Sequence, residues 1–382
     1  MAINPARPFS GWLRLVPTAQ PTSDVWTTST LDLSDEFFGA LRFPADVRAK
    51  GQELIDSYSP GLAPHLADRA YRRFAAFVRQ AENYYRSAKT LPYRSSALLY
   101  YYSFMNLAKA ALAARAIKFD EDHGLKPGYG NPPSDLTQLR VRVLAKGIFP
   151  ALYHLIFSQP IQNVQLQLSQ LLAYVSEVAV QYHEATQGQP KVARYARARL
   201  LHDNAQQQSW LLLAWPNALP LAAQPAPVQH AFTARFQQVT VAPPMARELF
   251  DLLVPGSLAH EYFQSFPPVP IATPHAVHTQ YILDALLGCV HPIYLEDEKG
   301  DFVLTVHCSA TNGSTWPMNE ICAIYLSMFF MGSLVRYRAD ILEDLLGTSA
   351  AWLLESFVNS APLLLLRTMT SVVLNRLLIF TR

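Results

Sequence analysis

The sequence contains few cysteines and few charged residues. It has 3 cysteines among 382 residues, Cys289, Cys308 and Cys322, which are too few and too clustered to build a disulfide framework. Such sparse cysteine is typical of a reducing cytoplasm, where we expect this protein to reside. Only 16% of the residues are charged, whereas 50% are hydrophobic. This balance excludes a disordered chain and predicts a globular protein with a large core.

The motifs of the commonest enzyme classes are also absent. The sequence has no P-loop, no Gly-x-Gly-x-x-Gly, no Gly-x-Ser-x-Gly and no His-Glu-x-x-His. We find no internal repeat and no heptad run. Residues 1–16 carry prolines and arginines but no apolar segment typical of a secretory signal. We therefore expect no cofactor and favour a protein without catalytic activity.

Two apolar runs near the end of the chain were compared with the requirements of a membrane span. Ile321 to Val335 is shorter than the ~20 residues that a spanning helix needs. The run from Ala361 to Phe380 is long enough, but Arg367 and Arg376 fall close to opposite sides of a helix at ~100° per residue. We expect both runs to be core helices and predict no transmembrane segment.

Charge is distributed unevenly along the chain. Residues 1–200 hold 23 Lys and Arg against 15 Asp and Glu, whereas residues 201–382 hold 8 against 14. A basic half can contact nucleic acid or acidic lipid, or it can dock on the acidic half or on a second copy in a homodimer. We favour docking. Candidate polyanion contacts lie on a predicted helix at 64–89, where the alternative is a solvated surface: Arg69, Arg72, Arg73, Arg79 and Arg86.

Hydrophobic spacing predicts a mainly α-helical bundle with a small antiparallel β-sheet inserted in the second half. We expect an extended arm over 1–60, ending in a short helix near 50–57, and a helical region over 61–205. Its core is an antiparallel hairpin of helices at 64–89 and 97–117. A mixed α/β insertion should span 206–316, and C-terminal helices at 317–382 should pack back on the helical region.

Within these regions we expect a polar loop at 120–133, helices at 135–157 and 162–186, and a basic helix at 191–202. In the insertion we expect strands at 210–215 and 234–241, a helix at 243–254, and a β-hairpin. The hairpin joins Pro292–Leu295 to Phe302–Val306 through an acidic turn containing Gly300.

The helix at 97–117 carries an unusual polar stripe. Tyr102, Asn106 and Lys109 recur at spacings of four and three on an otherwise apolar helix. Burying an amide and an ammonium costs several kcal/mol unless they find partners. The stripe therefore predicts either a pocket for an anion or polar ligand, completed by His123 and Arg336, or a structural role in which Asn106 caps a helix end or loop and Lys109 snorkels or pairs with a carboxylate.

Four segments in chain order carry a family resemblance. They read AENYYRSAK at 81–89, YYYSFMNLAKAAL at 100–112 with HGL at 123–125, KGIFPALYHLI at 146–156 and YLSMFFMGSLVRYRADILEDLL at 325–346. Together they resemble the YaaC-like family of bacterial proteins over most of the chain. The resemblance suggests a component of bacterial immunity. Residues 64–125 are also similar to the helical HEPN domains of prokaryotic toxins and defence systems.

Two further groups of residues could form a catalytic site or a metal site. Arg197 and His202 fit the Arg-x4-His spacing of HEPN ribonucleases, although Ala198 replaces the usual polar residue and chance explains the match more simply. Cys289 and His291 with His307 and Cys308 could suit zinc, but the adjacent pair would point to opposite faces of a strand, so we expect no metal site.

We expect a non-enzymatic sensor or adaptor that acts in antiphage defence with a protein effector encoded nearby. The alternative from another class is a metal-independent HEPN-type ribonuclease toxin with Arg197 and His202 as its catalytic residues. A weaker alternative is a binder of acidic membrane or lipid that uses the basic half.

Overall fold

The computed structural model describes residues 13–16, 24–27, 32–133, 135–186, 197–203, 208–216, 233, 236–241, 260–266, 269–270, 293–296, 302–305, 318–374 and 378–381. The chain forms two compact units. The helical unit contains residues 26–191 and 320–380, and the sheet unit contains residues 1–25 and 192–319. The predicted mainly α-helical fold with a small antiparallel sheet is confirmed.

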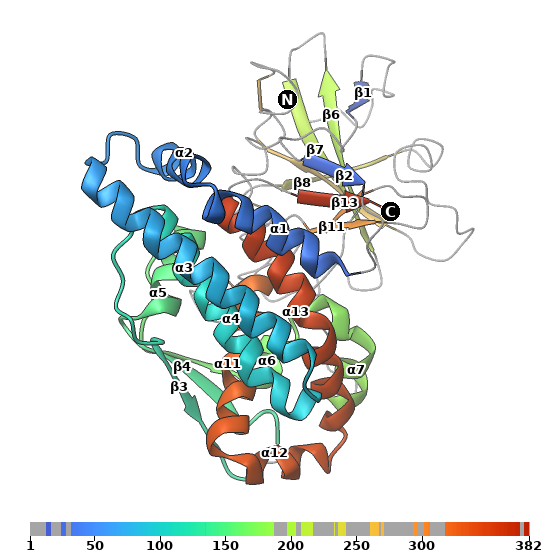
Figure 1. Ribbon diagram of the computed structural model, residues 1–382. Helices are drawn as coiled ribbons and strands as arrows, with labels where there is room; N and C mark the ends of the chain where they lie inside the picture. The colour runs from blue at the N-terminus through green and yellow to red at the C-terminus, as the bar shows by residue number, and fades with distance from the viewer. Residues whose placement is uncertain are drawn as a thin grey trace. The chain divides into compact units, whose positions relative to one another are not determined.

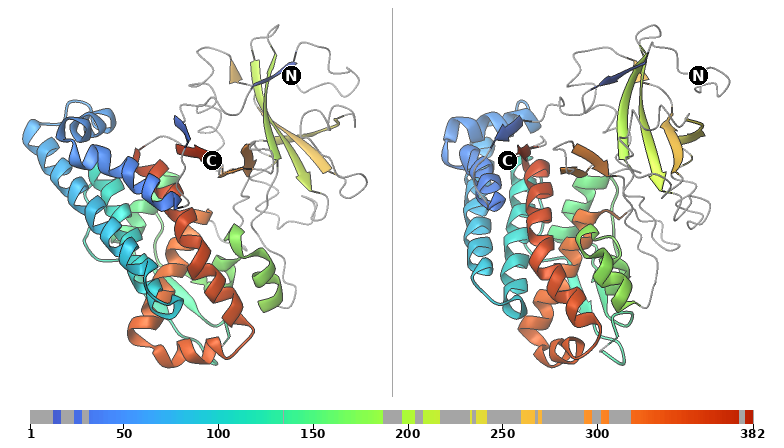
Figure 2. Two further views of the ribbon diagram at one scale, coloured as in Figure 1. Left: turned by 45° about the vertical axis from the view of Figure 1, so that its right-hand side comes forward. Right: turned by 90° about the vertical axis from the view of Figure 1, so that its right-hand side faces the viewer.

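A hairpin of two long helices lies at the centre of the helical unit. Helix α3 (Pro64–Lys89) begins with proline, which the first helical position tolerates, and buries one apolar stripe that includes Phe74 and Val78. Helix α4 (Tyr93–Ala114) is apolar on most of its surface because α3, α11 and α13 all pack against it (Figures 1 and 2). The predicted hairpin is therefore confirmed.

Helices α1 (Leu33–Asp46) and α2 (Arg48–Tyr58) pack against α3. Asp32 caps α1 by accepting a hydrogen bond from the Ser34 backbone N–H at 3.1 Å. At Gly51 of α2, an added Cβ would lie 2.4 Å from the Tyr71 ring, so the helices approach too closely for any side chain there. The expectation of an extended arm is thus wrong for residues 33–46, which form a capped helix.

Three short strands form a sheet where we expected only helices and a loop. Strands β3 (Leu125–Gly128), β4 (Arg140–Val143) and β5 (Val164–Gln167) pair antiparallel in that order. Their neighbours are α5 (Ile148–Phe157), α6 (Leu168–Leu172), the 3₁₀ turn η1 (Ser176–Val178) and α7 (Ala179–Ala185). The continuous helices predicted at 135–157 and 162–186 are therefore wrong at their starts.

The C-terminal helices return to the helical unit as predicted. Helices α11 (Glu320–Tyr337) and α13 (Ala350–Leu374) pack on α4, and α12 (Ala339–Leu346) links them. By length and composition alone α11 and α13 could each cross a membrane, but 78% and 61% of their most apolar windows are buried. This burial is typical of core helices.

The sheet unit contains an antiparallel sheet in the order β1-β6-β7-β9-β8, with β10 also paired to β7. Its strands are β1 (Leu13–Val16), β6 (Arg197–Asp203), β7 (Gln208–Pro216), β8 (Phe236–Val239), β9 (His260–Ser265) and β10 (Val269–Pro270). The basic helix predicted at 191–202 is wrong for residues 197–202, because β6 pairs with both β1 and β7.

The predicted hairpin is confirmed as β11 (Ile293–Glu296) paired antiparallel with β12 (Phe302–Thr305). A separate two-stranded sheet joins β2 (Asp24–Thr27) to β13 (Leu378–Thr381). The helix predicted at 243–254 lies outside the described residues.

Candidate functional site

A half-open pocket of about 170 Å³ lies in the helical unit beside the polar stripe of α4. It is formed by α4, α11 and the start of β3. Its apolar wall includes Leu98, Phe329 and Gly332. Its polar lining comes from Tyr101, Tyr102, His123, Ser333, Arg336 and Tyr337. We call this hollow the Tyr102 pocket.

Tyr102 and Arg336 meet in this pocket although 234 residues separate them in sequence. The Arg336 Nη1 donates a 2.7 Å hydrogen bond to the Tyr102 hydroxyl, and its guanidinium lies over the Tyr337 ring at 4.9 Å. Arg336 is exposed in the last turn of α11, and within the described residues no carboxylate forms an ion pair with it. A single uncompensated cation therefore stands at the mouth of the pocket.

The loop that carries His123 is held by backbone hydrogen bonds to the start of α5. Ile148 N–H donates to the carbonyl of Asp122 at 2.9 Å, and Phe149 N–H donates to that of His123 at 3.2 Å. Gly124 has φ 74°, and a Cβ there would lie 2.6 Å from Pro150. The His-Gly-Leu sequence thus needs its glycine, which lets the loop turn tightly enough to place His123 in the pocket.

Burial shifts the pKa values of two groups in the pocket, Tyr101 and His123. The Tyr101 hydroxyl and His123 Nδ1 lie 2.6 Å apart. Burial raises the pKa of Tyr101 well above its usual 10, so this hydroxyl keeps its proton and is hydrogen-bonded to Nδ1 in its neutral form. Burial lowers the pKa of His123, and Lys109 and Arg336 lower it further. A neutral imidazole presents Nε2–H as a donor when Nδ1 accepts from Tyr101, and a bare Nε2 as an acceptor when Nδ1 donates to Tyr101.

The five predicted ligand-binding residues separate into two groups. Tyr102, His123 and Arg336 line the pocket, whereas Asn106 and Lys109 do not. Asn106 is buried and donates to the Tyr102 carbonyl at 2.8 Å. Lys109 forms a 2.9 Å ion pair with Glu121 and lies over the Phe77 ring at 5.4 Å. Lys109 therefore has the carboxylate partner of the structural alternative, whereas Asn106 bonds within its own helix and is not a cap.

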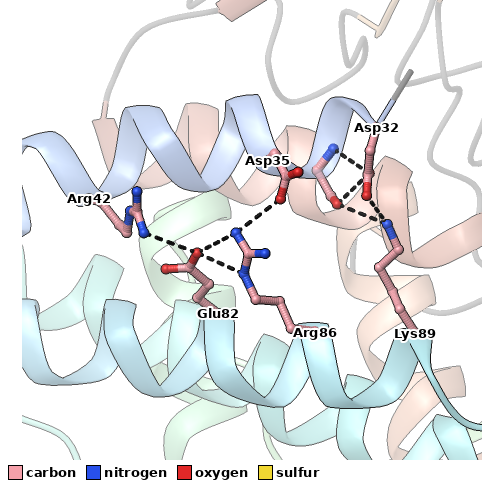
Figure 3. A network of polar contacts seen from close by, with 7 residues as sticks. Asp32, Asp35, Arg42, Glu82, Arg86 and Lys89 are labelled. Carbon is pink, nitrogen blue, oxygen red and sulfur yellow. Dashed lines mark hydrogen bonds and ion pairs between the residues drawn. The ribbon is translucent and has the colours of Figure 1, made fainter. Parts of the chain in front are cut away.

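The predicted polyanion face of α3 is largely occupied by carboxylates of the same unit. Arg86 pairs with Glu82 and Asp35, and the buried Glu82 also pairs with Arg42 at 3.5 Å (Figure 3). Lys89 contacts Asp32 in the same network. Farther along α3, ion pairs join Arg72 to Asp68, Arg73 to Glu121 and Arg79 to Asp46. Among the five predicted arginines, Arg69 has no ion pair with a described residue.

The ribonuclease candidates lie in the sheet unit and not on a helix. Arg197 and His202 belong to β6, where they pair with Ala214 and Ser209 of β7. Five residues along a strand span about 16 Å, roughly twice the rise over five residues of a helix.

The zinc candidates Cys289, His291, His307 and Cys308 lie outside the described residues. Among the residues that are described, no group of His, Cys, Asp or Glu could hold a metal ion.

Sequence reasoning missed two residues that shape the pocket. The Tyr101 ring packs on Phe329 at 5.3 Å, and its hydroxyl reaches His123. Gly332 allows α11 to approach α4, since an added Cβ would lie 3.2 Å from Leu98 Cα. The run of three tyrosines and a lone glycine within an apolar helix were the available signals.

Comparisons with known proteins agree with the motifs that line this site. The family described as YaaC-like protein matches residues 56–372, which include α3, α4, the His123 loop and α11. Neither the curated proteins nor the solved structures yield a match. Because the family match covers most of the sequence, the chain belongs to the YaaC-like family.

Proposed function

We propose that this YaaC-like protein is a non-catalytic sensor whose helical unit binds a small oxyanion, such as a phosphate or carboxylate group, in the Tyr102 pocket. The observation that supports this most directly is the hydrogen bond of the unpaired Arg336 to Tyr102 at the pocket mouth. A guanidinium without a carboxylate partner among the described residues, beside the Tyr102 hydroxyl and an imidazole, is a typical arrangement for anion recognition.

The donors converge without any competing negative charge. Tyr102 accepts from Arg336 and so can donate its own proton, and the His123 tautomer whose Nδ1 accepts from Tyr101 supplies Nε2–H as a further donor. The acidic residue that influences His123, Asp122, is exposed and does not line the pocket. At about 170 Å³ the pocket is smaller than the 300–1,000 Å³ usual for drug-sized ligands. A small anion or an anionic end group is therefore a better fit than an intact nucleotide.

The proposed signalling role rests on the expectation, attached to the YaaC-like resemblance, of a component of bacterial immunity. We propose that the protein acts in the cytoplasm as an antiphage sensor or adaptor with a protein effector encoded nearby. The ribonuclease alternative receives no support from the position of Arg197 and His202 on β6. Purified protein should accordingly leave RNA intact, and His202→Ala should not alter its function.

The sensor proposal is tested by titrating the full chain with inorganic phosphate, sulfate and acetate, with choline as a cationic control. Binding is followed by calorimetry and by the NMR signals of His123. We expect Arg336→Gln to weaken anion binding at least tenfold, since hydrogen bonds to charged groups contribute about 1.5–3 kcal/mol. Tyr102→Phe should weaken binding less, because the cation remains but loses its positioning contact.

Arg338→Gln is the matched control. Arg338 is two residues away, but it pairs with Asp340 at 2.7 Å and does not line the pocket. This variant should bind anions within twofold of the wild type. Equal losses in the two variants would indicate a general effect of net charge. Absence of saturable binding by all three anions, or cleavage of RNA that His202→Ala abolishes, would refute the proposal.

A further inference from the structure

A second cleft of about 330 Å³ lies in the helical unit between the start of α3 and the segment after α4. Leu66 and Ala70 lie on one face of α3, and Ala113 and Ile117 face them from the end of α4 and beyond. Leu66 remains 43% exposed although it lines an apolar wall. We call this hollow the Leu66 cleft. Its volume falls within the range usual for small-molecule sites.

Small side chains and a tight turn leave this space open. Helix α4 ends where the Ile117 N–H bonds the Leu112 carbonyl at 3.0 Å and Ala116 adopts φ 52°. This is the Schellman arrangement, which usually places glycine at the left-handed position. The turn reverses the chain so that Lys118 and Phe119 reach the cleft.

The rim of the Leu66 cleft is cationic. Arg69, Arg73 and Lys118 line it together with the apolar residues. Arg73 is paired with Glu121 and lies over the Phe119 ring at 4.8 Å. Arg69 and Lys118 form no ion pair with any described residue, in contrast to the paired Arg72, Arg79 and Arg86 of the same helix. Two unpaired cations therefore flank an apolar hollow.

We propose that the Leu66 cleft binds an amphiphilic carboxylate, an unbranched apolar chain with one anionic head. The chain would lie against Leu66, Ile117 and Phe119, and the head would be held by Arg69 and Lys118. This chemistry disfavours nucleic acid, which would present many charges and little apolar surface to a single hollow. The site is separate from the Tyr102 pocket, and the proposal does not rest on the sensing function.

The test titrates the full chain with hexanoate, octanoate and decanoate below their micelle concentrations, with decyltrimethylammonium as the cationic control. At the cleft we expect saturable binding whose affinity rises about fourfold per added methylene, because burying a CH₂ contributes ~0.8 kcal/mol. Decyltrimethylammonium should bind at least tenfold more weakly than decanoate. The rise of affinity with chain length should persist in the variant Arg336→Gln, in which carboxylate binding at the Tyr102 pocket is weakened, and this persistence separates the two sites.

Two variants locate the binding in the cleft. Leu66→Asp places a negative charge at the exposed rim and should weaken decanoate binding at least tenfold. Leu91→Asp is its matched control, since Leu91 is 41% exposed and does not line the cleft. Arg69→Gln, which alters no described ion pair, should weaken binding without changing the folded state. Equal binding of both amphiphiles, equal effects of the two Asp variants, or binding only to anionic vesicles would overturn the proposal.

Discussion

The guanidinium carbon of Arg115 lies 3.9 Å from the centre of the Tyr58 ring, and both side chains bond the end of the same helix. Arg115 donates to the Val372 carbonyl at 2.7 Å, and the Tyr58 hydroxyl donates to that of Val373 at 2.8 Å. Arg115 also donates to Ala111 at 3.1 Å. Carbonyls in a last helical turn form the negative end of the helix dipole, so this cation joins the ends of α4 and α13.

Replacing Arg115 by Met should therefore destabilise the helical unit. The variant leaves the Val372 carbonyl without its donor, and an unsatisfied buried acceptor costs about 1–3 kcal/mol. We expect a loss of that size in the free energy of unfolding, measured by urea denaturation. Arg94→Met serves as the control, because Arg94 is exposed and pairs with the equally exposed Glu343, so its loss should be below about 1 kcal/mol. Equal losses would show that Arg115 has no special role.

Stability should fall in mildly acidic solution because of His123. Burial, Lys109 and Arg336 lower the pKa of His123 in the folded protein, whereas an unfolded imidazole titrates near 6.5. As pH decreases below about 6.5 the unfolded chain takes up a proton first, so the free energy of unfolding falls. Urea denaturation at several values between pH 7 and 5 should show a steeper fall for the wild type than for His123→Gln. Parallel curves would contradict this assignment.

Two glycines should respond to alanine in opposite directions. Gly124→Ala puts a Cβ into a left-handed residue and 2.7 Å from the Lys146 carbonyl oxygen, so we expect a loss of about 2 kcal/mol or more. It should also disturb the NMR signals of His123. At Gly39, on the exposed side of α1, a Cβ meets nothing within 4 Å. Gly39→Ala should raise stability by about 0.5–1 kcal/mol. Thermal unfolding of both variants tests the local backbone geometry.

Glu121 should influence the titration of His123 although the two side chains share no hydrogen bond or ion pair. It pairs with Lys109 at 2.9 Å and with Arg73 at 2.6 Å. Glu121→Gln leaves the charge of Lys109 uncompensated, which should lower the pKa of His123 further. An NMR titration of the imidazole measures this change. Glu53→Gln, which alters a similarly exposed carboxylate paired with Lys50, should leave the His123 titration unchanged.

The long helices could be predicted closely from the sequence, whereas the short elements could not. Helix α3 has the predicted bounds Pro64–Lys89, because its apolar spacing extends over seven turns and proline marks its start. The four-residue strands β3 to β5 carry too few residues for periodicity to separate them from helix or loop. Helix α1 did offer a signal in Asp32, Asp35 and Glu36, but its internal Pro44 argued against a helix.

The residues of the Tyr102 pocket could be predicted only in part, because spacing indicates neighbours along one helix and not contacts between segments. Spacing along one helix predicted that Tyr102 and Asn106 share a stripe, and the structure relates them through one hydrogen bond. Whether Lys109 or Arg336 faces the pocket depends on which of them pairs with a carboxylate from another segment. Glu121, in the loop after α4, pairs with Lys109, whereas Arg336 on α11 keeps its charge unpaired. Spacing within a helix carries no information on such long-range pairing.

The loop from Lys118 to His123 contributes to both hollows of the helical unit. Lys118 and Phe119 line the Leu66 cleft, His123 lines the Tyr102 pocket, and Glu121 between them balances one cation on each side. The Glu121 carboxylate is thus shared by one cation near each hollow. An anion that drew Arg73 away from Glu121 would strengthen the interaction of Glu121 with Lys109. Any resulting effect on affinity must be mutual, because thermodynamic linkage gives each ligand the same factor on the other. Anion binding in the Tyr102 pocket and in the Leu66 cleft would then be coupled, so that the occupancy of each site depends on both anions.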